Sequence, residues 1–272
     1  TGIFSTSAAD LISDTASMTL GGGTLSIGGA ETFGNNGVTL STSTSSTISV
    51  GSELTASVSG TVTGSGNVSK TGTGQLNLSG NNDYTGTVAV DAGVLNLNSG
   101  TGGAAASAAS VSVASTARLL ISQSEQVNNN AAVSLSGGTI KLEETASESF
   151  GDLTVSSDSI LDFGNLTGVN MSFGTYTPTQ KITVNNFIGL STLVFKSDMT
   201  SSINDPSKFS FANGFNSAVW NSGTSTFTIT AIPEPSTYVA AAGLLALFLW
   251  PVRRRMIKDL KSILSLRPTG RA

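Results

Sequence analysis

Residues Lys70–Asn98 read KTGTGQLNLSGNNDYTGTVAVDAGVLNLN. Within this stretch, short apolar pairs alternate with small polar residues, which is the period of a half-buried β-strand. Glycines and an Asn-Asn-Asp corner separate the pairs and predict tight turns. The pair Leu76/Leu78 recurs 19 residues later as Leu95/Leu97. A repeat of roughly 20 residues predicts one coil of a β-solenoid.

The composition also predicts a turn-rich β-protein. The 272 residues include 31 Gly, no Cys and no His, and 11% of them are charged. The missing Cys excludes thiol catalysis and thiolate metal sites, and the missing His removes the commonest metal ligand and general base. Large aromatic residues are few, so the core must form from thin layers of Val, Leu and Ile. A solenoid needs only such layers, because each coil buries its face on the next.

Charge is divided unevenly along the chain. The residues before Ile232 include 6 basic and 15 acidic side chains and carry −9, whereas the remainder includes 7 basic and 2 acidic side chains and carries +5. The acidic body argues against nucleic-acid binding. The basic tail suits the cytoplasmic face of a membrane.

The stretch Lys70–Asn98 resembles the autotransporter-associated β-strand repeat. Asp83 and Thr87 depart from its pattern, in which Thr and Gly are usual, without moving the register. The resemblance implies a right-handed parallel β-helix on a secreted or cell-surface protein, and it implies no chemistry. The matching residues are Lys70, Gly72, Gly74, Leu76, Leu78, Gly80, Asn82, Tyr84, Thr85, Gly86, Val90, Gly93, Leu95 and Leu97.

The surrounding chain is expected to extend this all-β architecture. We predict a solenoid body over residues 1–165, with Ser99–Ser110 as a flexible or loosely helical loop between coils. Residues 166–231 are richer in Phe and include Trp220, which predicts a β-rich segment whose bulky side chains close the end of the core. Short strands are expected throughout, including one at Met18/Leu20.

The C-terminal region predicts a membrane anchor. Residues 237–252 carry no charge and are followed by Arg253, Arg254 and Arg255. As a helix, this segment spans about 24 Å, short of a hydrocarbon core of about 30 Å. Snorkelling arginines and Trp250 at the interface can make up the difference. We therefore predict a single transmembrane helix over residues 237–252.

The same region resembles the PEP-CTERM sorting signal, through Pro233, Glu234, Pro235 and Arg253–Arg255. The resemblance over residues 232–255 implies export, an inner-membrane-anchored precursor, recognition and cleavage by an exosortase, and delivery to the cell surface, often alongside exopolysaccharide. Residues 256–272 extend beyond the usual pattern and are expected to form a basic cytoplasmic extension. No signal-peptide pattern is visible at the start of the sequence, whereas the C-terminal segment depends on export. We therefore expect earlier residues to be missing from this sequence.

A structural or adhesive role is therefore favoured over an enzymatic one, with no catalytic residue, metal or cofactor. The first alternative is a lyase or glycosidase acting on polysaccharide, which requires carboxylates about 5–10 Å apart in one groove. Glu148, in the same acidic run, is interpreted as a residue that solvates a loop. The acid/base candidates are Glu143, Glu144, Asp152, Asp158 and Asp162, and Asp158 and Asp162 are expected to share one strand face.

The second alternative is a surface that binds carbohydrate or ice. Ser41–Thr47 carries a Thr-x-Thr pattern that occurs once in clear form, and we interpret it as a solvated polar segment. Trp220 and Tyr176 could form an aromatic platform for sugars. Asn128–Asn130 is interpreted as a structural corner at which Asn side chains hydrogen-bond.

Overall fold

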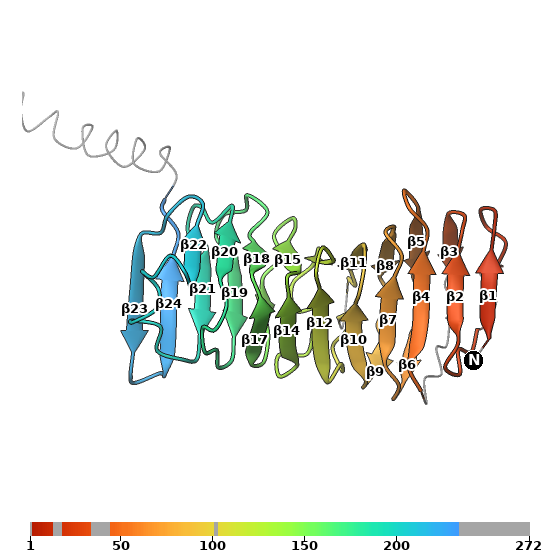
Figure 1. The fold of residues 1–272 in the computed structure, drawn as a ribbon, viewed down its shortest axis with the longest axis horizontal. Helices are drawn as coiled ribbons and strands as arrows, with labels where there is room; N and C mark the ends of the chain where they lie inside the picture. Colours follow the sequence, from red (N-terminus) through yellow and green to blue (C-terminus); the bar gives the residue numbers. More distant parts are fainter. Residues whose placement is uncertain (1, 13–17, 34–43, 101–102, 234–272) are drawn as a thin grey trace, which may run out of the picture. The chain divides into compact units, whose positions relative to one another are not determined.

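The computed structural model describes residues 2–12, 18–33, 44–100 and 103–233. Two compact units divide the chain, Thr1–Ile232 and Pro233–Ala272, and the fold described below is that of the first. Every named element in the described residues is a β-strand, and most strands pair in parallel with strands of neighbouring coils. The predicted all-β parallel solenoid is therefore confirmed for this unit (Figure 1).

Sheet A forms one side of the solenoid, with eight parallel strands stacked along its axis. Each coil from β1 to β17 contributes one strand, so strands that are distant in sequence lie side by side (Figure 1). In spatial order the strands are β1 (Ile3–Thr6), β2 (Thr24–Ile27), β4 (Ser46–Val50), β7 (Val68–Thr71), β10 (Thr87–Val90), β12 (Ser110–Ala114), β14 (Ala132–Ser136) and β17 (Leu153–Ser157).

Sheet B forms the second side and has nine parallel strands. A short corner connects each strand from β3 to β18 to the preceding sheet A strand of the same coil. In spatial order they are β3 (Glu31–Phe33), β5 (Thr55–Val58), β8 (Gln75–Leu78), β11 (Val94–Leu97), β13 (Arg118–Ile121), β15 (Thr139–Leu142), β18 (Ser159–Asp162), β20 (Ile182–Asn185) and β22 (Phe209–Phe211).

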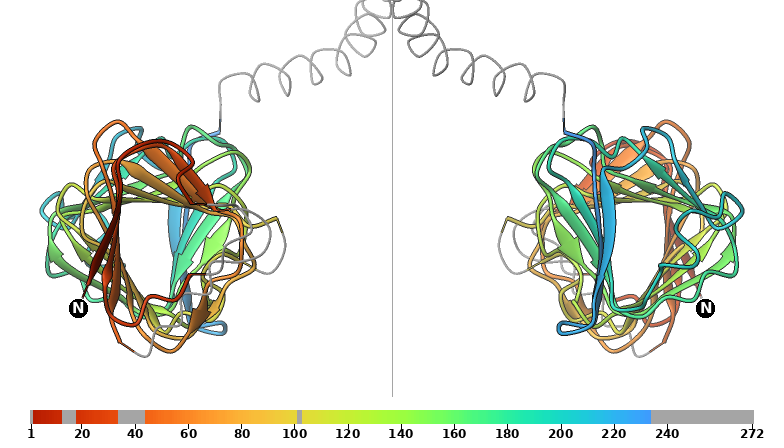
Figure 2. Two further views of the ribbon diagram at one scale, coloured as in Figure 1. Left: turned by 90° about the vertical axis from the view of Figure 1, so that its right-hand side faces the viewer. Right: turned by 90° about the vertical axis from the view of Figure 1, so that its left-hand side faces the viewer.

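The third side is less regular, and the view along the axis shows it closing each coil (Figure 2). Strands β6 (Thr63–Gly64) and β9 (Asp83–Tyr84) pair in parallel in the earlier coils. The later coils contribute β16 (Glu148–Ser149), β19 (Asn170–Phe173) and β21 (Thr192–Phe195), and the antiparallel strands β24 (Thr226–Thr230) and β23 (Ser217–Asn221) complete that sheet. Between these groups, the described residues 103–131 form only a single bridge on this side, Ala105 with Val127.

The core arises because inward positions stack in columns from coil to coil. In sheet B, Leu76 pairs in register with Leu95, and Leu95 with Leu119. All three are buried. Alternate residues in the same strands face outward, as the period of two requires. At the corner, Gly72 has φ +71°, and a Cβ atom there would lie 2.2 Å from the carbonyl oxygen of Val50 in the preceding coil. The turn therefore requires glycine.

Aromatic side chains stack on one another through the later coils. The ring of Phe173 lies 5.1 Å from that of Phe150 and 5.7 Å from that of Phe195, stacked on both. Phe163 and Phe187 meet edge to face at 4.8 Å. Sheet B continues without a break from β15 through β18 to β20, so the predicted body and capping segment share one core.

Two local expectations are wrong. Met18 and Leu20 lie in a segment without strand structure, although Leu20 is buried. The described part of Ser99–Ser110 forms turns and no helix, so the loosely helical form is wrong there, and Ala104, Ala105 and Ala108 are buried in the core. Small alanines fit there because the third side of this coil carries no strand and its backbone approaches the core directly.

Candidate functional site

A column of hydrogen bonds connects five successive coils along the third side, and we call it the polar column. The amide of Val62 donates to Oδ1 of Asn82 at 2.8 Å, and Nδ2 of Asn82 donates to the carbonyl of Ala104 at 2.7 Å. The amide of Ala104 donates to Oε1 of Gln126 at 3.3 Å. The amide of Gln126 then donates to Oε2 of Glu148 at 2.7 Å.

The polar column exists because this side of the solenoid lacks a continuous strand ladder. Buried backbone N–H and C=O groups need partners, and leaving one unpaired costs about 1–3 kcal/mol. Asn82, Gln126 and Glu148 are themselves buried, and their side chains supply those partners. The column is therefore a structural element, with its polar atoms committed to the backbone.

Glu148 ends the polar column and has a distinctive electrostatic environment. It is 0% exposed, and its two carboxyl oxygens accept from the amides of Gln126 and Val127. Burial raises the pKa of Glu148 to about 8; the hydrogen bonds from these amides oppose that rise, and the charge of Glu125 adds to it. Loss of water around a carboxylate disfavours its charged form, which explains the direction.

The interpretation of Glu148 as a solvated acidic residue is therefore wrong. A signal for its burial was present in the sequence, because Ala146, Glu148 and Phe150 alternate with polar neighbours and all three are buried. This alternation was missed because Glu148 was interpreted together with the nearby acidic residues Glu143 and Glu144.

Lys70 is the second buried ionisable group, and its side chain points inward from sheet A. It is in register with Ile48 and Val90 of the adjacent coils. Its Nζ donates to the carbonyls of Thr71 and Gly72 at 2.8 Å and to that of Ala92 at 3.1 Å. Burial lowers the pKa of Lys70 to about 8. The ammonium thus joins the corners of two successive coils.

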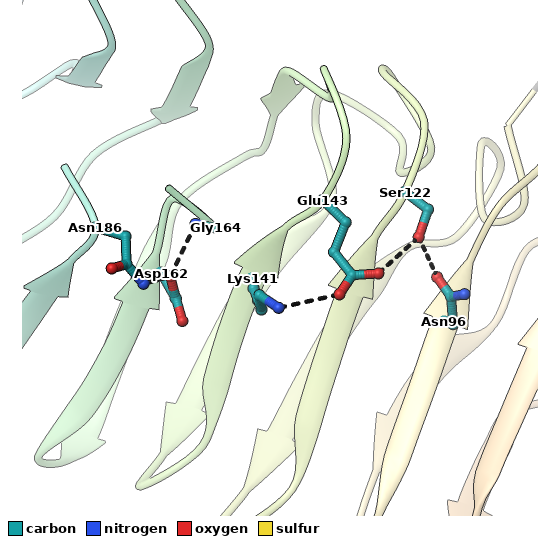
Figure 3. Close-up of polar contacts among 7 residues, drawn as sticks. All are labelled: Asn96, Ser122, Lys141, Glu143, Asp162, Gly164 and Asn186. Atoms are coloured by element: carbon teal, nitrogen blue, oxygen red, sulfur yellow. Dashed lines mark hydrogen bonds and ion pairs between the residues drawn. The ribbon is translucent and has the colours of Figure 1, made fainter. Parts of the chain in front are cut away.

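A polar row crosses several coils of sheet B (Figure 3), in which Asn96 and Ser122 are buried and the other side chains are partly exposed. Oγ of Ser122 lies 2.8 Å from Oδ1 of Asn96 and 3.2 Å from Oε2 of Glu143. Lys141 and Glu143 form an ion pair at 3.0 Å, the only one found in the described part of the chain. Further along, Oδ1 of Asp162 accepts from the amide of Gly164 at 2.8 Å and from Nδ2 of Asn186 at 2.7 Å.

The five predicted acid/base candidates do not share one groove. Glu143 and Asp162 belong to the polar row of sheet B, and Glu144 accepts from Gln123 at a turn. Asp152 and Asp158 flank strand β17 of sheet A, about 20 Å apart at roughly 3.3 Å per residue. Hydrogen bonds from Thr175 lower the pKa of Asp152.

The expectation that Asp158 and Asp162 share a strand face is wrong. Asp158 forms the corner between β17 and β18, where it accepts from the amide of Lys181 at 3.0 Å, and only Asp162 lies in β18. Ser159 is the first residue of that strand, so the strand is too short to include both carboxylates.

The aromatic and Asn-rich candidates also have structural contacts. Tyr176 is 2% exposed, its hydroxyl donates to the carbonyl of Gln180, and burial raises its pKa to about 12. An exposed sugar platform at Tyr176 is therefore wrong. Trp220 lies in β23, partly buried against the core. Nδ2 of Asn128 donates to the carbonyl of Ala108, and its Oδ1 accepts from Asn130, as a structural corner requires.

The predicted sorting residues lie at and beyond the end of the described region. Pro233 is its last residue, and Glu234, Pro235, Arg253, Arg254 and Arg255 lie outside it, as does the predicted helix 237–252. In the part of the chain that is described, no helix is long and apolar enough to span a bilayer. The same residues contain no cluster of three or more acidic side chains placed to hold a metal ion.

Comparison with known proteins identifies one family model, the passenger-associated transport repeat, at residues 68–97. The match extends from β7 through β11 and includes the corner that Lys70 joins. It confirms the autotransporter-associated repeat predicted from the sequence. No curated protein and no solved structure matches the chain. The protein is thus a repeat β-solenoid that resembles autotransporter passenger domains, a resemblance consistent with an exported or surface structural protein.

Proposed function

We propose that this chain is a structural or adhesive protein of the cell surface or of its exopolysaccharide matrix. The observation that supports this most directly is the passenger-associated repeat at residues 68–97, which lies within a coil-on-coil solenoid. We further propose that the coils wind in the right-handed sense favoured by parallel crossover connections. The chain performs no catalysis and needs no cofactor.

The contacts of the ionisable groups support a non-enzymatic role. Lys70 and Glu148, two buried groups whose pKa values are strongly shifted by burial, bond to backbone atoms. Perturbed groups at catalytic sites usually face a cleft that admits substrate. Here the ammonium of Lys70 stabilises the corners of two coils, and the carboxyl group of Glu148 stabilises the backbone of the third side, so both groups have structural roles.

The polar row of sheet B is the proposed contact surface for exopolysaccharide. Its partly exposed groups are those of Lys141, Glu143, Asp162 and Asn186, which lie on or beside adjacent strands about 4.8 Å apart. Groups of these kinds form hydrogen bonds with sugar hydroxyls. A polymer that lies along the solenoid axis can contact several coils together.

Delivery is proposed to depend on the C-terminal segment. Pro233, Glu234 and Pro235 form the site that an exosortase recognises, helix 237–252 anchors the precursor in the inner membrane, and Arg253–Arg255 remain on the cytoplasmic face. Residues 256–272 extend along that face. Cleavage near Pro-Glu-Pro then leaves the solenoid at the surface.

Fractionation of cells that express the full chain tests this proposal. In the wild type, we expect a shortened protein to leave the inner membrane. Replacing Pro233, Glu234 and Pro235 by Ala should leave the full-length precursor in the inner membrane. Pro206→Ala, which changes a turn within the solenoid, is the matched control and should be sorted as the wild type is. Equal release of the triple variant and the wild type would refute the sorting proposal.

A further inference from the structure

The outer face of sheet A carries short side chains in register from coil to coil. Two rows, separated by one inward-facing position, form what we call the hydroxyl lattice. The first row is Thr24, Thr47, Ser69, Ala89, Ser112, Ser134 and Thr154. The second row is Ser5, Ser26, Ser49 and Thr71.

The lattice is regular in two directions. Adjacent strands lie about 4.8 Å apart, and residues two apart along one strand are separated by about 6.6 Å. The first register shift in sheet A falls between Leu135 and Ser136, at the β14–β17 pair. From β1 to β14 the strands therefore stack without a break in register, side by side along the solenoid (Figure 1).

The lattice rows themselves contain no charged side chain, although the carboxylate of Asp91, directly after β10, accepts a hydrogen bond from Ser69 of the first row. The one charged residue in the strands of sheet A, Lys70, points into the core. Apart from Ile3, every outward position of these strands is Ser, Thr or Ala. The outer face of sheet B differs, since it carries Arg118, Lys141 and Asp162.

Most lattice hydroxyls are available to a ligand. Ser69 pairs with Asp91, and Thr87 pairs with Ser110 at the margin of the lattice. The remaining hydroxyls make no side-chain hydrogen bond to any residue that the structure describes, and they are partly or fully exposed. They belong to Ser5, Thr24, Ser26, Thr47, Ser49, Thr71, Ser112, Ser134 and Thr154.

We propose that the hydroxyl lattice binds crystalline water, that is, the surface of ice. A polyanion finds no cationic side chain in these rows, because Lys70 points into the core. A sugar ring finds no aromatic side chain on which to stack. Short side chains on in-register strands enclose no small molecule. The surface of ice requires none of these features, and an ordered array of hydroxyl groups can form hydrogen bonds with it.

The energetics also favour an extended crystal as the ligand. Each hydroxyl contributes a weak contact, but the strands hold all of the hydroxyls in fixed positions, so little conformational freedom is lost when they bind together. Thr24, Thr47 and Thr154 are β-branched, which restricts χ1 and fixes where each hydroxyl and methyl group points. Many weak contacts on a rigid lattice then act as one surface.

The Thr-x-Thr pattern, residues 42–44, lies partly outside the described residues. Of the described residues 44–47, Thr44 and Ser45 are exposed, Ser46 points inward to bond the carbonyl of Leu20, and Thr47 belongs to the lattice. The other members come from separate coils, about 20 residues apart in sequence. The array is therefore assembled by coil stacking and is not visible as one motif.

Ice partition tests this proposal. The full chain is frozen slowly onto a cooled surface in dilute detergent, and the protein in the ice is compared with the protein in the remaining liquid. Thr47→Lys places a long charged side chain in the centre of the lattice. Thr183→Lys makes the same change at an outward position of β20 in sheet B and is the matched control. Ser134→Lys is a second lattice variant at an exposed position.

We expect the wild type and Thr183→Lys to be enriched in ice at least tenfold over Thr47→Lys and Ser134→Lys, with all four giving the same far-ultraviolet circular dichroism. Exclusion of the folded wild type from ice, to the extent of a soluble protein of similar mass, would overturn the proposal. Equal partition of the lattice and control variants would do so as well. A parallel arm measures sedimentation with crystalline cellulose. Binding there that Thr47→Lys abolishes, without enrichment in ice, would assign the face to a neutral glycan and also overturn it.

Discussion

The backbone amide of Gln126 lies 2.7 Å from Oε2 of Glu148, which belongs to the next coil of the solenoid. A buried carboxylate here takes the place of a strand partner. The same arrangement occurs near the other end, where Glu31, 1% exposed, accepts from the amides of Leu11 and Ile12. Each carboxylate binds two consecutive amides of the preceding coil, so a side chain closes the backbone where the sheet cannot.

Glu148 should make stability depend on pH in a specific direction. Its folded-state pKa of about 8 lies above the ordinary value of 4.5. Between these values the folded protein holds a proton that the unfolded chain has released, so the free energy of unfolding falls as pH rises through this window. We expect Glu148→Gln to flatten that fall, as measured by chemical denaturation. The control Glu144→Gln alters an exposed carboxylate and should keep the wild-type dependence of the free energy of unfolding on pH. If that free energy fell as steeply in Glu148→Gln as in the wild type, another group would be responsible.

Lys70→Met should destabilise the solenoid although it preserves an unbranched side chain. The three carbonyls of Thr71, Gly72 and Ala92 lose their shared donor. Unsatisfied buried acceptors cost about 1–3 kcal/mol in the free energy of unfolding. Lys141→Met removes a partly exposed ion pair instead and should cost less than about 1 kcal/mol. Similar losses for the two variants, measured by urea denaturation, would argue against the corner role of Lys70.

Gly72→Ala and Gly168→Ala separate the effect of close backbone approach from that of backbone conformation. Both glycines have φ of +71°, so both substitutions bear the left-handed penalty of about 1–2 kcal/mol. At Gly168 nothing lies within 4 Å of the added Cβ, whereas at Gly72 the Val50 carbonyl oxygen lies at 2.2 Å. We therefore expect Gly72→Ala to lower the midpoint of thermal unfolding clearly more than Gly168→Ala. Equal midpoints would mean that the coils can move apart at this corner without loss of stability.

Asn82 and Tyr84 should be energetically coupled. Nδ2 of Asn82 and the hydroxyl of Tyr84 both donate to the carbonyl of Ala104, at 2.7 and 3.1 Å. Residues that share a partner show coupling energies of about 0.5–3 kcal/mol in double-mutant cycles. A cycle of Asn82→Ala with Tyr84→Phe should give a value in this range. The reference cycle of Asn82→Ala with Tyr176→Phe, whose hydroxyl has a different partner, should be additive.

The fold could largely be predicted from the repeat. The alternation around Leu76 and Leu95 and their spacing of 19 residues predicted strands, corners and coil length, because a period of two and a coil of fixed length are properties of the chain itself. The site could not be predicted in the same way. Glu148 lies within an acidic run in the sequence, yet it is buried, because its partners Gln126 and Val127 belong to another coil.

By itself, the sequence determined that this protein would form stacked β-coils without disulfides, with small residues at the corners and aromatic residues concentrated toward the later coils. Only the tertiary structure decided which polar residues point inward and which align on the surface. The physical reason is that coil stacking brings together residues about 20 positions apart. The polar column and the hydroxyl lattice are both built from such contacts, and neither exists within any single segment of the chain.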